Sequence, residues 1–171
     1  NAMTKYGIKI PDMQLACAPV NSQEGQDYLK AMNCGINFAF VNRQLITYQI
    51  RNAFEKVFNQ SAENLEMDII YDVSHNTAKI EEHKLGNERK KVIVHRKGAT
   101  RSFGPGNDEL TGMFKKTGQP VIVGGSMETG SFLCVGTKKA EEDTFGTTLH
   151  GSGRTMSRTM ARKMIRGERL Q

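Results

Sequence analysis

Hydrophobic residues recur every three or four positions between residues 21 and 58, with polar residues in the intervals. This spacing places the hydrophobic residues on one face of a helix, and we expect that face to pack in the core. Asn21-Ser22-Gln23-Glu24 supplies a capping residue, Asn21, with an acid three residues on, Glu24, as at many helix starts. The pattern therefore predicts a helix that ends near Phe58 or breaks near Gly35. Its apolar positions are Tyr28, Met32, Ile36, Phe40, Leu45, Ile46, Ile50, Phe54 and Val57.

Shorter apolar runs in the rest of the chain are typical of strands and turns. Two prolines interrupt residues 4–20, which we expect to be irregular or extended. We expect a loop over 59–66, a helical turn over 77–83, and a loop rich in glycine, serine and threonine over 124–131. Runs of alternating or branched residues predict four strands, at 67–73, 90–97, 119–123 and 132–135.

The last predicted element is an amphipathic helix from about Arg154 to Arg166. Arginines four residues apart form one stripe, and methionines form another about 200° around the axis. We expect the methionines to face the core and the arginines to face solvent or a polyanion, since guanidinium groups bind phosphate well. The two stripes consist of Arg154, Arg158, Arg162 and Arg166, and of Met156, Met160 and Met164.

These elements predict a mixed α/β fold (α+β) with a long N-terminal helix, central strands and a basic C-terminal helix. The 171 residues are enough for one domain with a core, and we expect that domain to span 3–171. Asn1 and Ala2 are interpreted as the remnant of a tag ahead of Met3. No apolar run approaches the roughly 20 residues needed to cross a bilayer, and three scattered cysteines argue against a disulfide framework or a zinc site. We therefore expect a cytoplasmic protein with no membrane partner.

The net charge of +6 favours an anionic partner, and the position of the charge is more informative. Arg96, Lys97 and Arg101 surround a Gly-Ala-Thr turn, and six further basic residues lie in the last eighteen residues. Both groups flank glycine-rich segments, where phosphates are often held. A solvated basic surface remains the alternative interpretation.

One histidine stands directly ahead of a glycine-rich turn and the basic helix, in Leu149-His150-Gly151-Ser152-Gly153-Arg154. Glycines let a backbone approach a ligand closely, and the unpaired amides at a helix start suit a phosphate. His150 is therefore either a nitrogen nucleophile or ligand held against a phosphate, or a partly buried histidine in a plain turn. His75 follows a predicted strand and is either a metal ligand or a hydrogen-bonded structural residue. We expect His83 and His95 to be structural.

Several common catalytic motifs are missing from the sequence. It contains no Gly-x-x-x-x-Gly-Lys-Ser/Thr and no Gly-x-Gly-x-x-Gly, which excludes P-loop and dinucleotide sites. It has neither the Lys-x-Asp-Gly motif of ATP-dependent nucleic-acid ligases nor a serine nucleophile elbow. What remains is a set of histidines, Gly-Ser loops and basic residues.

The remaining motifs follow one another in a characteristic order. They are Gly7-Ile8-Lys9-Ile10-Pro11-Asp12, Gln14-Leu15-Ala16-Cys17-Ala18-Pro19, Glu24-Gly25-Gln26-Asp27-Tyr28-Leu29, Ala31-Met32-Asn33-Cys34, Asp72-Val73-Ser74-His75-Asn76, His95-Arg96-Lys97-Gly98-Ala99-Thr100-Arg101, Gly125-Ser126-Met127 and His150-Gly151-Ser152-Gly153-Arg154. In order and spacing, this set resembles the RtcB family of RNA-splicing ligases, from about Gly7 to the last residue.

The resemblance implies a piece of that family's α/β fold and an RNA ligase that uses GTP and Mn²⁺. Members of the family join an RNA 3′-phosphate or 2′,3′-cyclic phosphate to a 5′-hydroxyl, in tRNA splicing and RNA repair. A histidine attacks the α-phosphorus of GTP, the guanylyl group moves to the RNA 3′-phosphate, and the 5′-hydroxyl displaces GMP. The partners that the resemblance implies are tRNA halves or broken RNA ends.

The resemblance also implies roles for single residues. His150 matches the nucleophile, and His75 matches a Mn²⁺ ligand. Lys97, Arg154 and Arg158 match residues that hold RNA phosphates. Contacts with the guanine nucleotide are implied for Asn76, Gly124, Gly125, Ser126, Met127, Ser131, Gly151, Ser152 and Gly153. The chemistry agrees with these roles, because neutral imidazole is a good nucleophile near neutral pH.

Other motifs of the family do not occur in this sequence. They include the Gly-Gly-Gly-Asn-His-Phe motif and the segments that carry the remaining metal ligands. We therefore expect a truncated homologue or fragment that ligates RNA weakly or not at all by itself. The alternative function is that of a non-catalytic RNA- or nucleotide-binding remnant, which assembles with itself or with a partner chain.

Overall fold

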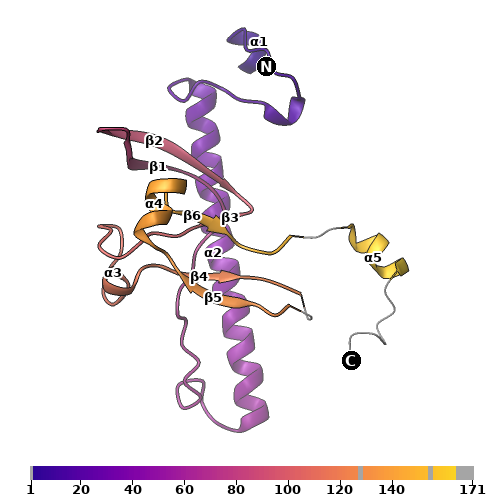
Figure 1. Cartoon of the computed structure of the whole chain (residues 1–171). Coiled ribbons are helices and arrows are strands. Elements are labelled where there is room, and N and C mark those ends of the chain that lie inside the picture. Colours follow the sequence, from indigo (N-terminus) through magenta and orange to yellow (C-terminus); the bar gives the residue numbers. More distant parts are fainter. Residues whose placement is uncertain (1, 127–128, 154–155, 165–171) are drawn as a thin grey trace. The chain divides into compact units, whose positions relative to one another are not determined.

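The computed structural model describes residues 2–126, 129–153 and 156–164, without the side chain of Arg158. Its internal contacts divide the chain into two compact units, a first unit Asn1–Asp68 and a second unit Ile69–Gln171. Figure 1 labels the helices and strands of both units. None of the helices in the described ranges has the length and hydrophobicity that crossing a bilayer requires.

The first unit consists mainly of one long helix. The predicted helix is confirmed as α2 (Gln23–Phe58), which continues through Gly35 and ends at Asn59 in the left-handed conformation. Its cap lies one residue later than predicted, because the Ser22 hydroxyl accepts the Gly25 amide at 3.1 Å. Two short helices interrupt the irregular lead-in that precedes it, α1 (Ala2–Lys5) and η1 (Met13–Leu15).

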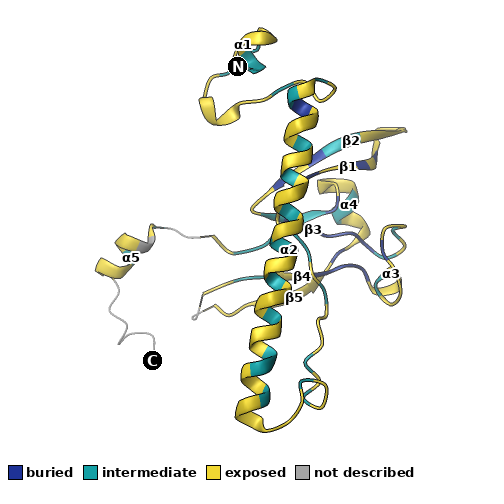
Figure 2. Cartoon of the chain, turned by 180° about the vertical axis from the view of Figure 1, so that it is seen from behind, coloured by how far each residue is buried: buried dark blue, intermediate teal, exposed yellow. Residues whose placement is uncertain are grey.

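The apolar face of α2 does not form a core, contrary to the prediction. Met32, Ile36 and Phe40 are half-buried, whereas every apolar position from Leu45 to Phe58 is exposed (Figure 2). Gly25 is the single buried residue of this helix. The other helices of the unit, α1 and η1, are short and bury none of their own residues, so within the described part of the unit no second helix covers the apolar face of α2.

The second unit contains the six strands and the three remaining helices of the described chain (Figure 1). The strands are β1 (Asn76–Leu85), β2 (Glu88–Lys97), β3 (Ala99–Arg101), β4 (Pro120–Val123), β5 (Phe132–Val135) and β6 (Thr147–Leu149). The helices are α3 (Phe114–Thr117), α4 (Lys138–Thr144) and α5 (Arg158–Met164). The strands form three antiparallel pairs, β1–β2, β3–β6 and β4–β5. The predicted mixed α/β composition is confirmed, and so are the strands that became β2, β4 and β5.

Two predictions between residues 67 and 85 are wrong. Residues 67–73 form no strand, and residues 77–83 form most of strand β1 instead of a helical turn. β1 pairs along its whole length with β2 across Gly86-Asn87, where Gly86 has a φ of 63°. A two-residue Gly-Asn connection is a hairpin signal, and it outweighs the local helical pattern.

The C-terminal helix differs from its prediction in extent and in packing. α5 covers Arg158–Met164, while Arg154 and Arg166 lie outside the described residues. Met160 and Met164 are exposed, so the expectation that the methionine stripe faces the core is wrong for these two residues. The core of the second unit lies elsewhere, and its apolar members are Ala78, Val94, Phe103, Leu110 and Val121.

Candidate functional site

The rings of His75 and His150 lie against each other. Their centroids are 4.3 Å apart and their planes are inclined by 36°. Strand β3 brings the two segments together at its first residue, because the Ala99 amide donates to the carbonyl of His75 while Ala99 pairs with Leu149 in the ladder with β6. The two histidines that the sequence singles out are thus neighbours in space.

Asn76 connects this histidine pair with the end of the β1–β2 hairpin. Its Nδ2 lies 3.2 Å from Nε2 of His75, and its Oδ1 accepts the amide of Gly98 at 3.0 Å. Asn76 is also paired with Lys97 in the β1–β2 register, and the side chain of Lys97 is exposed. The exposed ammonium group of Lys97, opposite Asn76, can therefore contact a phosphate.

The two predicted nucleotide-binding loops are joined directly at their glycines. Gly124 and Gly151 form a parallel bridge. The Gly124 amide donates to the carbonyl of His150 at 3.0 Å, and the Ser152 amide donates to the carbonyl of Gly124 at 2.8 Å. Gly124 and residues 150–152 are thus held together next to the histidine pair.

The loop that follows Gly124 is closed by its own polar groups. The Gly125 amide donates to the hydroxyl of Ser131 at 3.3 Å, and the Gly130 amide donates to the carbonyl of Ser126 at 2.8 Å. A Cβ at Gly125 would overlap the carbonyl oxygen of Gly130, so this position requires glycine. Met127, a predicted nucleotide contact, lies outside the described residues.

The predicted phosphate-binding residues fall into different environments. Lys97 is exposed beside the histidine pair, whereas Arg154 and the side chain of Arg158 lie outside what is described. The expected basic cluster around residues 96–101 is not a solvent-facing cluster. Arg96 is only 2% exposed, and Nη1 of Arg101 donates a hydrogen bond to the Glu109 carboxylate at 2.6 Å.

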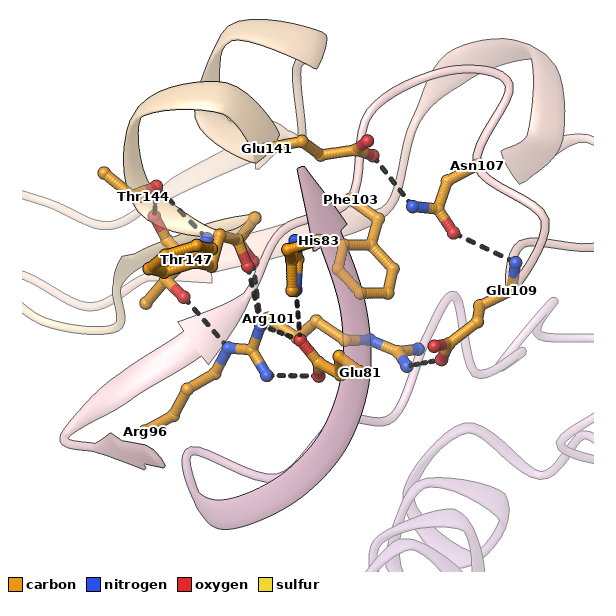
Figure 3. Close-up of polar contacts among 12 residues, drawn as sticks. Glu81, His83, Arg96, Arg101, Phe103, Asn107, Glu109, Glu141, Thr144 and Thr147 are labelled. Atoms are coloured by element: carbon orange, nitrogen blue, oxygen red, sulfur yellow. Dashed lines mark hydrogen bonds and ion pairs between the residues drawn. The ribbon is translucent and has the colours of Figure 1, made fainter. Parts of the chain in front are cut away.

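The second unit also contains a buried ionic network that the sequence patterns did not reveal (Figure 3). Arg96 donates to the Glu81 carboxylate through Nη1 at 2.6 Å and through Nη2 at 2.8 Å. Nε2 of His83 lies 2.9 Å from the same carboxylate, which agrees with the structural role predicted for His83. Burial by itself raises the pKa of Glu81, but the hydrogen bonds from Arg96 and then His83 outweigh it, so the pKa is lowered. The period-two pattern of Thr77, Glu81 and His83 is the signal that could have revealed this strand and its inward carboxylate.

A cavity of about 720 Å³ opens on another part of the second unit. Its lining includes His83, Asn107 and Glu141, and neither His75 nor His150 contributes to it. The Glu141 carboxylate accepts the Gly104 amide at 2.6 Å and the side-chain amide of Asn107 at 3.1 Å. This carboxylate holds the turn at Gly104 and Asn107 in place. We assign the cavity no role in the chemistry.

The described residues supply one candidate metal ligand but not a complete site. His75 offers an imidazole nitrogen, yet no group of three or more His, Cys, Asp or Glu side chains converges within the described ranges. Manganese favours several oxygen and nitrogen ligands together. These residues therefore do not by themselves fit a tightly bound Mn²⁺ ion.

Comparison with known proteins gives a consistent result over the whole chain. The family model for "tRNA-splicing ligase RtcB" matches residues 1–171. Proteins of that name from Methanococcus maripaludis and Archaeoglobus fulgidus are 59% and 54% identical, over 100% and 97% of this chain. A relative from Methanocaldococcus jannaschii is 54% identical over 99% of this chain. The chain spans 36%, 34% and 18% of these three relatives, respectively.

Proposed function

The chain belongs to the RtcB family of tRNA-splicing ligases, and on that premise we propose that it carries the guanylylation site of an RNA ligase. His150 is the nucleophile. A neutral imidazole nitrogen attacks the α-phosphorus of GTP, a P–N bond forms as the bond from that phosphorus to the bridging oxygen breaks, and pyrophosphate leaves. The observation that supports this role best is the contact of the His75 and His150 rings at 4.3 Å beside two joined glycine loops.

The guanylyl group then passes to RNA. An oxygen of the RNA 3′-phosphate attacks the same phosphorus, the P–N bond breaks, and His150 is free again. The 5′-hydroxyl of the second RNA end next attacks the 3′-phosphorus and loses its proton, and GMP leaves as the new phosphodiester forms. A 2′,3′-cyclic end enters after hydrolysis to the 3′-phosphate. Lys97, Arg154 and Arg158 hold the RNA phosphates, because charge on the transferring groups favours cations around them.

The joined glycine loops hold the guanine nucleotide. Glycine permits close approach of the backbone to a phosphate, and Gly153 has a φ of 74° that favours glycine. Short serine side chains add polar groups on these loops, and the side chain of Asn76 adds another next to His75. The residues assigned to this role are Asn76, Gly124, Gly125, Ser126, Met127, Ser131, Gly151, Ser152 and Gly153.

His75 acts as one ligand of a divalent ion, for which we propose Mn²⁺. When bound, such an ion neutralises phosphate charge and helps pyrophosphate to leave. Because the described residues do not complete the ligand set, a tight site needs donors beyond them. We therefore expect the chain by itself to form the guanylyl-histidine only in small amounts and to ligate RNA weakly or not at all.

Incubation with α-labelled GTP and Mn²⁺ tests the role of His150. We expect a substoichiometric, acid-labile label on the protein, because a phosphoramidate bond hydrolyses in acid. The label should disappear in His150→Ala and persist in His95→Ala, which removes an exposed histidine of strand β2. A label that survives His150→Ala would contradict the assignment.

A second candidate function is binding of RNA or a nucleotide without catalysis. The exposed Lys97 beside the histidine pair, together with the incomplete metal ligand set in the described chain, favours this alternative. RNA affinity should then fall steeply with salt, and Lys97→Met should reduce the log–log slope by about 1. Lys116→Met, on the exposed side of α3, is the control and should leave the slope unchanged. RNA binding without a label on His150 would favour this candidate over the ligase, and a flat salt dependence would remove it.

Assembly with itself or with a partner chain accompanies either candidate. Large apolar side chains of α2 are exposed, among them Phe38, Val41, Leu45 and Phe54, and such surfaces commonly mark protein interfaces. Sedimentation should therefore show association that increases with concentration. A monomer at every concentration tested would contradict self-assembly.

A further inference from the structure

Arg96 is the most deeply buried charge among the described residues of the second unit, and the proposed chemistry does not use it. It is 2% exposed, and it lies where three segments of the unit meet (Figure 3). We propose that Arg96 is a positioning residue that sets the contact between His75 and His150. This inference rests on the function proposed for His150 and names a residue that acts through the histidines without touching substrate.

Arg96 is connected to His75 through strand β1. In the β1–β2 ladder, Arg96 stands directly opposite Thr77, shortly after His75 in the chain. Its guanidinium is fixed by the Glu81 carboxylate, also on β1, through hydrogen bonds of 2.6 and 2.8 Å. Backbone pairing and side-chain pairing thus hold Arg96 to the strand that begins next to His75.

Arg96 is connected to His150 through the turn into strand β6. Nε of Arg96 donates to the hydroxyl of Thr147 at 3.0 Å, and Nη2 donates to the carbonyl of Phe145 at 2.8 Å. These two residues flank the turn from α4 into β6, and His150 follows directly after β6. β6 has only three residues and pairs with the equally short β3. Such a short ladder fixes its position weakly. The Thr144 hydroxyl holds the start of β6 locally, and the bonds from Arg96 tie that start to the β1–β2 hairpin.

Arginine is required for this arrangement because of its shape. A planar guanidinium donates from several nitrogens in fixed directions, whereas the lysine ammonium is a point charge on a flexible stem. Arg96 uses Nε, Nη1 and Nη2 toward β6 and β1 at the same time. Lysine would keep the positive charge next to Glu81 but could not reach both strands. The substitution Arg96→Lys therefore separates positioning from charge compensation.

The contact between the two histidine rings can be observed directly in solution by NMR. The chain has only four histidines, so the imidazole signals of the 171-residue protein can be assigned by single substitutions. Rings at 4.3 Å should give a nuclear Overhauser effect between His75 and His150. The matched control is Val94→Ala, which removes buried volume from the same strand without touching the bonds of Arg96.

We expect Arg96→Lys to abolish the Overhauser effect and Val94→Ala to retain it, even where both variants lower Tm. Retention in Arg96→Lys would overturn the inference, and so would a loss in both variants, which would indicate general loosening. If Arg96→Lys does not fold, Thr147→Val provides the test, because it removes only the acceptor for Nε of Arg96. A weaker Overhauser effect in Thr147→Val supports the inference, and an unchanged Overhauser effect overturns it. Absence of the effect in the unsubstituted protein would overturn the inference and the histidine pair of the proposed function together. Failure of the guanylylation assay with an intact pair would instead affect the proposed function alone.

Discussion

The two units of this chain are stabilised by different kinds of contact. In the first unit, α2 is a helix of 36 residues with a serine cap and a single buried residue. In the second unit, the buried Arg96 is bound to Glu81 in its own hairpin and to Thr147 far along the chain, and the bridge between Gly124 and Gly151 connects two further segments that are distant in sequence. The structure of the first unit follows from its local sequence, and the structure of the second unit depends on a few specific long-range contacts.

This difference has a consequence for function. The stability of a solvated helix is spread over many small local terms, so single changes in α2 should have limited effects. A buried ion pair leaves an uncompensated charge when one partner is lost, and a close glycine contact leaves no room for a side chain. The geometry around His75 and His150 should therefore respond strongly to single substitutions in the second unit.

The largest effect is expected for Glu81→Gln. This change leaves the buried Arg96 without its carboxylate and should destabilise the second unit by about 3–5 kcal/mol. Glu82→Gln on the same strand is the control, because Glu82 is half-exposed and pairs with Arg89 at 3.5 Å, a surface contact worth less than about 1 kcal/mol. Hydrogen exchange of the β2 amides measures both effects. Equal losses in the two variants would contradict the contrast between buried and surface pairs.

The next largest effect is expected for Gly125→Ala. The added Cβ would overlap the carbonyl of Gly130, and such overpacking costs about 1–3 kcal/mol. The loop should open, so the Gly130 amide, bonded to Ser126 at 2.8 Å, should exchange faster. Gly124→Ala is the control, because a Cβ there meets the carbonyl oxygen of His150 at 3.6 Å, an ordinary contact. An unchanged exchange rate in Gly125→Ala would show that the loop does not need glycine.

A glycine of the first unit should respond in the opposite direction. Gly35 lies within α2, and a Cβ there would meet nothing within 4 Å. Gly35→Ala should stabilise the helix by roughly 0.5–1 kcal/mol, because alanine loses less backbone entropy. Thermal unfolding followed by far-UV circular dichroism at 222 nm is the measurement. A lower Tm would indicate that Gly35 is held by contacts, as Gly125 is.

The smallest effect is expected at the exposed pair of the first unit. The hydrogen bond from Lys5, and next that from Tyr6, lowers the pKa of Glu24 to about 2 from 4.5. Since the folded pKa is the lower one, the contact contributes stability above pH 4.5 and loses it as the pH falls toward 2. Lys5→Met should move the Glu24 carboxyl titration back toward 4.5 in an NMR experiment, with little change in Tm at neutral pH because surface pairs are weak. Lys9→Met is the control and should leave the Glu24 pKa unchanged. An unchanged Glu24 pKa in Lys5→Met would contradict the assignment of the shift to the hydrogen bond from Lys5.

Sequence patterns predicted those parts of the molecule whose structure is set locally. α2 follows from its spacing and cap, and β4 and β5 follow from short branched runs. The helical turn predicted for residues 77–83 was wrong because pairing with β2 decides the conformation of that segment. The strand predicted for 67–73 was wrong because no strand of the described chain forms a ladder with those residues, all of which are described.

The candidate site was predicted as a set of residues but not as an arrangement. The motifs indicated His75, His150 and the loops, and their chemistry suggested phosphate and nucleotide. The contact between the rings and the bridge from Gly124 to Gly151 depend on long-range pairing that no local pattern contains. Arg96 was grouped with exposed phosphate-binding residues because its partner, Glu81, lay in a segment whose conformation was predicted incorrectly.

Titration with GTP tests most directly whether the two histidines and the glycine loops form one nucleotide site. The imidazole signals of all four histidines would be followed by NMR as GTP is added to the protein. The signals of His75 and His150 should shift together and saturate, while those of the buried His83 and of His95 on the β1–β2 hairpin stay in place. Signals of His75 and His150 that do not respond to GTP, or a response confined to His95, would contradict the account.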